Sequence, residues 1–269
     1  MIHDNESTVR TAYTHGHHES VLRAHRWRTV ENSAAYLTPY LRPGATLLDV
    51  GCGPGTITAD FASRLRPGTV IGIDASTEIV ATARRDYPDV AFAVGDVHNL
   101  QFQGASWDIV HAHQLLQHLV DPVAALKEMR RVVKPGGIVA ARDSDYGSFT
   151  WYPADRRLDE WLDLYHRIAY ANGGEPRAGR HLLSWALKAG FAHVAPSASC
   201  WCFATSEERS WWGGLWAERI TSSAIAEQVL REGLASEKQL NAIADAWRTW
   251  AAAEDGWLAM LHGEIICTR

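Results

Sequence analysis

One short stretch near residue 50 constrains the fold of this chain more than any other. The stretch runs from Leu47 to Gly55, LLDVGCGPG, and its apolar start ends in three alternating glycines. This pattern predicts a buried strand that breaks into a tight loop. Residues 57–65 then carry apolar side chains at helical spacing. The order strand, glycine loop, helix brings bare backbone N–H groups and a helix N-terminus up to a ligand.

The spacing of the glycines distinguishes between ligands. A dinucleotide fingerprint, G-x-G-x-x-G, needs its third glycine at position 56, where this chain has threonine. The pattern here is D-x-G-x-G-x-G, formed by Asp49, Gly51, Gly53 and Gly55. It resembles motif I of the class I S-adenosylmethionine (SAM) methyltransferases, whose loop wraps the methionine part of SAM. The resemblance implies that these four residues bind SAM, and a purely structural turn is the alternative.

Composition and charge exclude several classes of protein. With 269 residues, 46% of them hydrophobic, the chain is long enough for one large domain with an elaborated insertion. The net charge of -5 provides no basic field that would gather nucleic acid. Neither a secretion signal nor a membrane span is indicated, so we expect a cytoplasmic protein with no membrane partner. The four cysteines form no C-x-x-C pair, and we expect no metal site.

Acidic residues follow two further strands of the pattern. The β-branched run 69–73 ends at Asp74, about twenty residues past the glycine loop, where a carboxylate can accept both ribose hydroxyls of a nucleoside. Capping of the next helix is the alternative for Asp74, although Ser76 or Thr77 can cap it instead. The run 90–94 is followed by Asp96, for which a plain Gly-Asp turn is the alternative.

The methyltransferase resemblance assigns these positions to the nucleoside half of SAM. It implies that Asp74 and Ala75 contact the ribose. It also implies that Asp96 takes the exocyclic amine of adenine and that Val97 lies beside the adenine in backbone contact.

The alternation of strand-like and helix-like runs continues to residue 142, with further strands expected at 107–112 and 138–142. It predicts an α/β fold with a doubly wound, mostly parallel sheet, whose ligands bind beyond the carboxyl ends of the strands. The Lys-Pro-Gly-Gly turn before 138–142 also resembles the class I methyltransferases, and the likeness is to the ubiquinone/menaquinone-biosynthesis type, a broad small-molecule group. This family implies a Rossmann-like sheet of seven strands with an antiparallel last strand.

The later part of the chain changes pattern. A helical, Trp-rich run at 206–253 separates two strand-like runs, and insertions of roughly fifty residues usually carry function. We therefore expect four regions: an N-terminal helical arm over the cofactor site (1–44), a SAM-binding α/β core (45–205), a helical cap insertion (206–254) and a final core strand (255–269).

Several titratable side chains are expected near the strand ends, where an acceptor would meet the methyl group. The candidates for a general base are His113, His118, Asp143 and Asp145, and His113 also lies where the cofactor is expected. Simple hydrogen bonding is the alternative for each histidine, and a structural role is favoured for His111.

The N-terminal arm supplies candidates that cover the cofactor. They are Tyr13, His17, His25 and Arg28, of which Arg28 could meet the SAM carboxylate through paired hydrogen bonds. A solvated helix face is the alternative for each of these side chains.

Aromatic residues suggest the nature of the acceptor. Of 12 tryptophans, most follow residue 150, which indicates an aromatic-lined cavity as well as ordinary core. We expect the substrate pocket to be lined by Tyr146, Trp151, Tyr152, Trp211, Trp212 and Trp216. Such a lining suits a small apolar or aromatic molecule, whereas the alternative is that the rings only pack the insertion onto the sheet.

The sequence thus predicts a SAM-dependent methyltransferase that acts on a small molecule by in-line transfer to O, N or C. Two other classes stay open. A dinucleotide-dependent oxidoreductase is disfavoured by Thr56, and a non-catalytic SAM-fold scaffold is disfavoured by the intact glycine loop with Asp74 and Asp96. The oligomeric state is not predicted.

Overall fold

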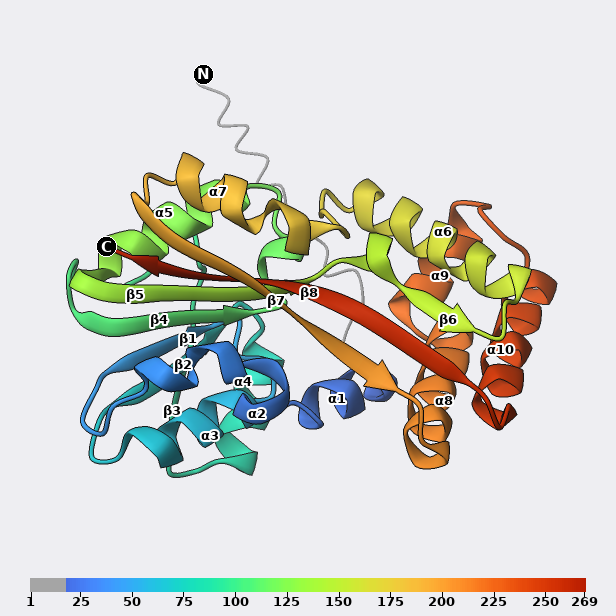
Figure 1. Cartoon of the computed structure of the whole chain (residues 1–269), viewed down its shortest axis with the longest axis horizontal. Helices are drawn as coiled ribbons and strands as arrows, with labels where there is room; N and C mark the ends of the chain where they lie inside the picture. The colour runs from blue at the N-terminus through green and yellow to red at the C-terminus, as the bar shows by residue number, and fades with distance from the viewer. Residues whose placement is uncertain (1–17) are drawn as a thin grey trace, which may run out of the picture.

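A computed structural model of the chain describes residues 18–269 (Figure 1). The strands are β1 Leu47–Val50, β2 Val70–Asp74, β3 Ala91–Val94, β4 Trp107–His113, β5 Val133–Ser144, β6 Thr150–Tyr152, β7 His193–Phe203 and β8 Trp257–Thr268. The helices are α1 Glu19–Arg26, α2 Val30–Ser33, α3 Thr56–Leu65, α4 Thr77–Asp86, α5 Pro122–Val132, α6 Arg156–Ala171, α7 Leu182–Lys188, α8 Ser206–Ser222, α9 Ala224–Arg231 and α10 Glu237–Ala252. Four short 3₁₀ helices complete the list: η1 Ala35–Tyr40, η2 Leu116–His118, η3 Tyr146–Ser148 and η4 Ala178–His181.

The strands of the described residues form one sheet in the order β3-β2-β1-β4-β5-β8-β6, with β7 also pairing with β8. Strands β1 to β5 are mutually parallel, and β8 runs antiparallel to β5, β6 and β7. All four residues of β1 are buried, as expected for a central parallel strand covered on both faces. The predicted doubly wound α/β fold with antiparallel last strands is therefore confirmed.

The sheet has eight strands where the sequence predicted seven. The additional strand is β6, a three-residue segment directly after the last parallel strand. It pairs with the first residues of β8, because β8 is twelve residues long and extends past the end of β5. Only three residues pair, so its sequence gave no alternating pattern that distinguished it from a loop.

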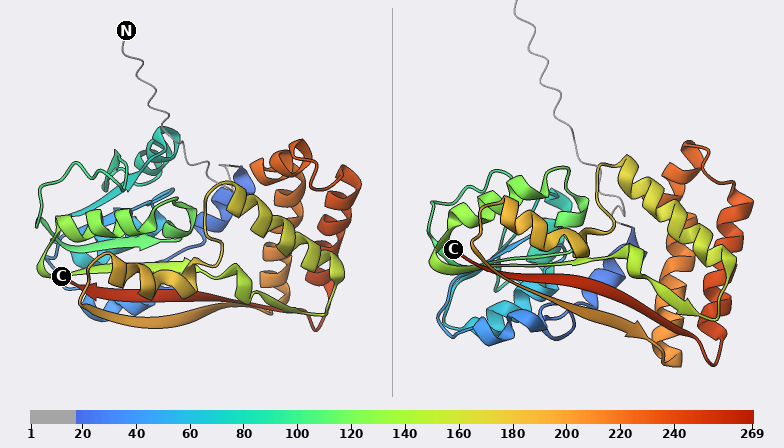
Figure 2. Two further views of the ribbon diagram at one scale, coloured as in Figure 1. Left: turned by 90° about the horizontal axis from the view of Figure 1, so that it is seen from above. Right: turned by 45° about the horizontal axis from the view of Figure 1, so that its top comes forward.

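A second group of helices lies at one end of the sheet, on the right of Figure 1. It consists of α6, α8, α9 and α10, which contact one another around the far ends of β6, β7 and β8 (Figure 2). These elements share one apolar cluster in which the indole rings of Trp161, Trp216 and Trp247 contact each other. The helical run predicted at 206–253 thus forms three helices, which share a hydrophobic core with α6 and with the ends of β7 and β8.

The start of α8 shows why that region begins a helix where it does. Thr205 accepts a hydrogen bond from the backbone N–H of Glu208, and the Glu208 side chain accepts from the backbone N–H of Thr205. This reciprocal capping box satisfies two otherwise unpaired donors at the helix start. It orients α8 directly after β7, so that one face of the helix meets the carboxyl ends of the sheet strands.

Candidate active site

The glycine loop joins β1 to α3 and takes the conformation that its residue types allow. Gly51, Gly53 and Gly55 have φ angles of 69°, 56° and 89°, in the left-handed region that favours glycine. A Cβ on Gly51 would lie 2.9 Å from Leu115, and one on Gly55 would lie 2.7 Å from Phe92. A Cβ on Gly53 would have only the ring of His25, 3.7 Å away, within 4 Å among the described residues. Gly53 is therefore the glycine whose bare backbone faces open space.

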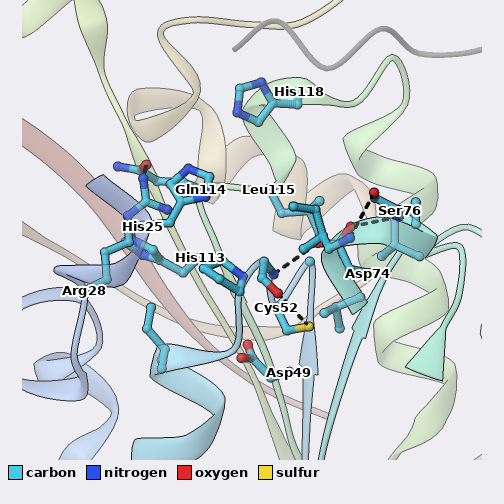
Figure 3. Close-up of a pocket in the computed structure, with 18 of the residues that line it drawn as sticks. His25, Arg28, Asp49, Cys52, Asp74, Ser76, His113, Gln114, Leu115 and His118 are labelled. Atoms are coloured by element: carbon cyan, nitrogen blue, oxygen red, sulfur yellow. Dashed lines mark hydrogen bonds between the residues drawn. The ribbon is translucent and has the colours of Figure 1, made fainter. Parts of the chain in front are cut away.

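That open space is a cavity of about 1030 Å³ at the carboxyl ends of β1, β2 and β4. Figure 3 shows it running from Asp74 and Ser76 on one side to Arg28 and Gln114 on the other. A volume of this order holds a ligand of drug size or larger, buried on most sides.

Thirteen of the residues predicted from the sequence line this cavity together. They are His25, Arg28, Asp49, Gly51, Gly53, Asp74, Ala75, Asp96, Val97, His113, His118, Tyr146 and Trp212. Gly55 does not line it and instead forms the N-cap of α3 against Phe92. Tyr13 and His17 lie outside the described residues.

Asp74 ends β2 and holds the loop in shape. Its Oδ2 accepts a hydrogen bond from the backbone N–H of Gly53 at 3.0 Å, and its Oδ1 accepts from the N–H of Ser76 at 3.0 Å. The N-cap of α4 is Ser76, whose hydroxyl accepts from the N–H of Ile79. Since Ser76 caps the helix, the Asp74 carboxylate is not used as the cap, and Asp74 lines the cavity.

Asp49 is a buried structural member of the site. Its Oδ1 accepts a 2.7 Å hydrogen bond from Nδ1 of His111, and its Oδ2 accepts a 2.5 Å bond from the hydroxyl of Thr58. These bonds link β1, β4 and α3 beneath the glycine loop. His111 therefore has the structural role that the sequence favoured, and Asp49 acts on a ligand by fixing the loop above it.

Asp96 and Val97 follow β3 at the same edge of the sheet. The Asp96 carboxylate accepts hydrogen bonds from the backbone N–H and the ring of His98, while 65% of its side chain stays exposed. Val97 is buried in the cavity wall. The turn and the ligand-binding interpretations of Asp96 are thus compatible, because its oxygens have capacity beyond the bonds to His98.

His113 ends β4 in the middle of the cavity, between the two sides seen in Figure 3. Its side chain is buried, and both ring nitrogens have no hydrogen-bond partner among the described residues. Burial, together with the charges of Arg28 and Arg142, holds the pKa of His113 well below its usual range. The imidazole is therefore neutral, with one donor and one acceptor nitrogen, both buried.

His118 lies in η2 on the cavity wall, where the ring is half-buried. Its Nε2 accepts a hydrogen bond from the side-chain amide of Gln117 at 3.0 Å, since the Gln117 oxygen is already bonded to Ser144. Burial, with a smaller contribution from the charge of Arg28, lowers the pKa of His118 to about 3. His118 is thus a neutral side chain and a weak base.

The two acidic candidates at the end of β5, Asp143 within the strand and Asp145 directly after it, do not line the cavity. Asp145 is 2% exposed and forms a paired ion bridge with Arg180, at 2.6 and 2.9 Å. Asp143 is fully buried, accepts from the N–H of Gln117, and has a pKa raised to about 7 by burial. The expectation that Asp145 acts as a base is therefore corrected, because its carboxylate is occupied by a guanidinium away from the open space.

The predicted aromatic lining divides into two groups. Tyr146 and Trp212 line the cavity, whereas four of the predicted rings do not. Trp216 lies in the core of the helical group and Trp211 packs on Trp27, with ring centroids 5.2 Å apart. Trp151 and Tyr152 lie in β6, and Tyr152 is 57% exposed. The expectation that these four rings line the pocket is therefore corrected. Amphipathic periodicity does not indicate whether an aromatic side chain packs in the core or faces a ligand.

Four further residues complete the far side of the cavity, and the sequence analysis missed them: Gln114, Trp201, Arg219 and Met260. Gln114 had a signal, because it directly follows His113 at the end of a parallel strand. Its φ of 50° is rare for a non-glycine residue. The other three come from β7, α8 and β8 and reach the cavity only through the tertiary fold.

Arg28 is held in place by Gln114. Its guanidinium donates to the Gln114 side-chain oxygen at 2.5 Å, and the Gln114 amide donates to Nε2 of His262 at 2.9 Å. The guanidinium also lies 5.8 Å from the ring centroid of Trp201. Helix α1 contributes His25 to the cavity wall, and the residues after it contribute Arg28.

The residues that line the cavity are of chemical types suited to bind SAM. Gly53 offers bare backbone where the methionine part is expected, Asp74 places a carboxylate in the cavity wall next to the loop, and Val97 offers an apolar wall beside Asp96. Within residues 18–269, no three His, Cys, Asp or Glu side chains are grouped so as to hold a metal ion. No helix in that same range is long and apolar enough to span a membrane. Fold and site together define a Rossmann-like nucleoside-binding protein of the methyltransferase type.

Comparison with known proteins agrees with this class. The family described as "Methyltransferase domain" matches residues 48–141. An uncharacterised methyltransferase of Schizosaccharomyces pombe is 35% identical over 276 residues, which cover 97% of this chain and 98% of that protein. A demethylmenaquinone methyltransferase of Beutenbergia cavernae is 34% identical over 143 residues, 52% of this chain and 58% of that one. The chain therefore belongs to the class I SAM-dependent methyltransferases.

Solved structures share the fold. A Haemonchus contortus phosphoethanolamine N-methyltransferase 2, in complex with phosphomonomethylethanolamine and S-adenosylhomocysteine (SAH), superposes with a TM-score of 0.56 at 20% identity. The match covers 88% of this chain and 52% of that chain, so this protein spans about half the length of the enzyme. The likeness concerns the fold alone.

Proposed function

We propose that this methyltransferase acts on a small apolar or aromatic molecule, bound in the same cavity as its cofactor. The observation that carries the proposal is the continuity of that cavity. One side consists of the glycine loop, Asp74 and Asp96, and the other consists of Tyr146, Trp201, Trp212 and Met260. Aromatic walls with a few polar groups are typical of small-molecule sites. A polyanionic nucleic acid is a poor fit, because the chain has a net charge of -5 and would repel it.

The cofactor side of the cavity is built to bind and orient. The bare backbone of Gly53 and the start of α3 border the cavity where the methionine part is expected, and Asp74 lines the cavity beside them, where we place the ribose. Bound SAM supplies an activated methyl group on its sulfonium. The residues of the chain contribute proximity and alignment, which place the acceptor atom in line behind that methyl group.

The acceptor side of the cavity excludes water. Trp201, Trp212 and Met260 are each buried, and Tyr146 stacks on Tyr165 with ring centroids 3.8 Å apart. Rigid aromatic walls of this kind fix a flat or apolar ligand without large losses of side-chain freedom. His113 lines the cavity between the two sides with a neutral imidazole.

The test is methyl transfer itself. Purified full-length protein is incubated with SAM carrying an isotopically labelled methyl group and a small-molecule extract of cells, and labelled products are identified by mass. The proposal expects one or a few labelled organic molecules of low mass, and the Gly53→Val variant should produce none. Protein or RNA is added as a competing acceptor, and transfer of the label to either would contradict the small-molecule assignment. Absence of the label from every fraction would favour a non-catalytic scaffold.

A dinucleotide-dependent oxidoreductase is the other enzyme class considered, and the structure adds an argument against it. The third glycine of its fingerprint would stand at Thr56, the first residue of α3, whose hydroxyl donates to the carbonyl of His25 at 3.2 Å. This bond ties α1 to the loop and narrows the space above it. The cytoplasmic location, the lack of a nucleic-acid partner and the four-region division of the chain stay predictions.

A further inference from the structure

His98 lines the cavity where the segments that follow β3 and β4 form its wall. Asp96, Val97 and Asp121 line the same part of the wall, which we call the adenine end. In the sheet order β3-β2-β1-β4, two strands lie between the strands from which these segments start. A contact between the segments therefore joins two parts of the cavity wall that the sheet itself does not join.

The ring of His98 makes such a contact through both of its nitrogens. Nδ1 lies 3.0 Å from Oδ1 of Asp96, and Nε2 lies 3.2 Å from the backbone carbonyl oxygen of Asp121. The backbone N–H of His98 donates to the same Oδ1 of Asp96 at 2.9 Å. The ring thus connects the Asp96 carboxylate to the residue that forms the N-cap of α5.

Both oxygens that face the His98 ring are hydrogen-bond acceptors. A neutral imidazole has one donor nitrogen and one acceptor nitrogen, so it donates to only one of these oxygens. In either neutral tautomer, a nitrogen lone pair would face an oxygen lone pair. The imidazolium has two N–H donors, and it alone makes both bonds, one of them a charge-assisted bond to a carboxylate.

The other charged side chains on the neighbouring elements have partners of their own. The carboxylate of Asp121 caps α5. On that helix, Glu128 and Arg131 pair with each other and bond to the backbone two residues after the ring. On β2, Asp74 accepts hydrogen bonds from the glycine loop and from the start of α4. Among the ion pairs described, Asp96 is therefore the charged partner of the ring.

Resting on the assignment of Asp96 to the exocyclic amine of adenine, we infer that His98 is a positioning residue for the cofactor. Its protonated ring holds the Asp96 carboxylate at the cavity wall and joins it to the start of α5, so that the adenine end is formed before the cofactor binds. Both bonds from His98 go to Oδ1, and we assign the amine to Oδ2. A wall that is formed in advance strengthens binding because less ordering has to accompany it.

This role makes cofactor binding depend on pH and on the nucleobase. Loss of the proton from His98 removes one of the two ring bonds, so a smaller fraction of the chain has the adenine end formed, and affinity falls as pH rises. A carboxylate that is no longer held also discriminates less between an amine, which donates to it, and a carbonyl, which repels it. The side chains of His98 and Asp96 are 32% and 65% exposed, so we expect effects of a few fold.

The experiment is calorimetric titration of the full chain at pH 6 and pH 8 with SAH and with S-inosylhomocysteine, in which a carbonyl replaces the exocyclic amine. Wild-type protein should bind SAH about fivefold more weakly at pH 8 than at pH 6, and at pH 6 it should prefer SAH to the analogue by about tenfold or more. His98→Leu should bind SAH about fivefold more weakly than wild type at pH 6, without this pH dependence and with a preference of about threefold.

His98→Arg separates the charge of the ring from its shape. A guanidinium stays positively charged at both pH values and has several N–H donors. This variant should therefore bind SAH at pH 8 about as tightly as wild type does at pH 6. A ring that served only to fill space would not be replaced by arginine in this way. A thermal melt accompanies each variant to show that it is folded.

His193→Leu is the matched control, because His193 is exposed at the start of β7, outside the cavity. It should retain the affinities and the pH dependence of wild type. A pH dependence in His98→Leu equal to that of wild type would overturn the inference. An equal loss of affinity for SAH and its analogue in His98→Leu, or a His98→Arg variant as weak as His98→Leu, would also overturn it.

The inference and the assignments beneath it fail in different ways. Failure of wild-type protein to bind SAH at either pH would contradict the cofactor assignment on which the role of His98 rests. Normal SAH binding without methyl transfer to any small molecule would contradict the proposed function and leave the role of His98 unchanged.

Discussion

Asp74 offers the sharpest single-residue test of the cofactor site. Its two oxygens already accept one backbone N–H each, from Gly53 and Ser76, both at 3.0 Å. The side chain lines the cavity at the end of β2, where we place the two ribose hydroxyls. Asp74→Ala removes both charge-assisted bonds, each worth roughly 1.5–3 kcal/mol, and water replaces part of that loss. We expect a net loss of about 2–4 kcal/mol, or about 30- to 1000-fold in the Kd for SAH.

The assay is calorimetric titration with SAH, alongside a thermal melt of each variant. Asp74→Asn keeps one carbonyl-type oxygen and should fall between wild type and Asp74→Ala, at about tenfold weaker binding. Asp86→Ala is the control. Asp86 is the last residue of α4, the helix that follows Asp74, and it lies outside the cavity. Among the ion pairs described, it pairs only with Arg85. An SAH affinity within threefold of wild type in Asp74→Ala would refute the ribose assignment and leave Asp74 as a residue that shapes the loop.

Three further predictions follow from the same geometry. Gly53→Val should abolish SAH binding, measured by calorimetry, because the side chain would enter the cavity. Gly233→Val carries a similar backbone strain at φ 66° with no atoms near its Cβ, and it should bind SAH normally. Trp212→Phe should raise the Michaelis constant for the acceptor with little change in SAH affinity, whereas Trp211→Phe, outside the cavity, should change neither. The folded-state pKa of His118, about 3, lies below its unfolded value of about 6.5, so the unfolded state takes up the proton first and stability falls as pH drops below about 6.5. Urea unfolding at pH 7 and pH 5 should show a smaller acid-induced loss in His118→Gln than in wild type, by about 2 kcal/mol, and an equal loss would contradict this pKa.

The first half of the sheet could be predicted from the sequence because its signals are local. The apolar run into Asp49 and the alternating glycines gave β1, the loop and α3, and the acidic residues after the next two strands gave the nucleoside side of the cavity. Each of these features depends on residues within a few positions of one another. Parallel strands then bring their carboxyl ends to one edge without further information.

The acceptor side could not be predicted in the same way, because its walls come from distant elements. Trp201 reaches the cavity from β7, and Arg219 reaches it from α8. The aromatic rings were predicted to line the pocket from their place in the insertion. Trp216 shows that this place alone does not decide whether a ring reaches the cavity. It is on the same helix as Trp212, four residues further along, and both rings belong to the apolar cluster of the helical group, yet only Trp212 of the two also lines the cavity.

The base candidates failed for a related reason. Asp145 follows β5, and His113 is the last residue of β4. Only the fold shows that Arg180 pairs with the Asp145 carboxylate and that both ring nitrogens of His113 lack a hydrogen-bond partner among the described residues. Arg180 lies 35 positions after Asp145 in the sequence, so only the tertiary fold identifies it as the partner of that carboxylate. The sequence can therefore name the edge of the sheet where chemistry occurs, and the packing of η4 and α8 decides which side chains are available there.

The most direct measurement of the central claim is a calorimetric titration of wild-type full-length protein with SAH and, separately, with NAD. The account predicts one SAH site per chain, saturable and competitive with SAM, and no binding of NAD at the same concentrations. Saturable binding of NAD without any heat from SAH or SAM would contradict it.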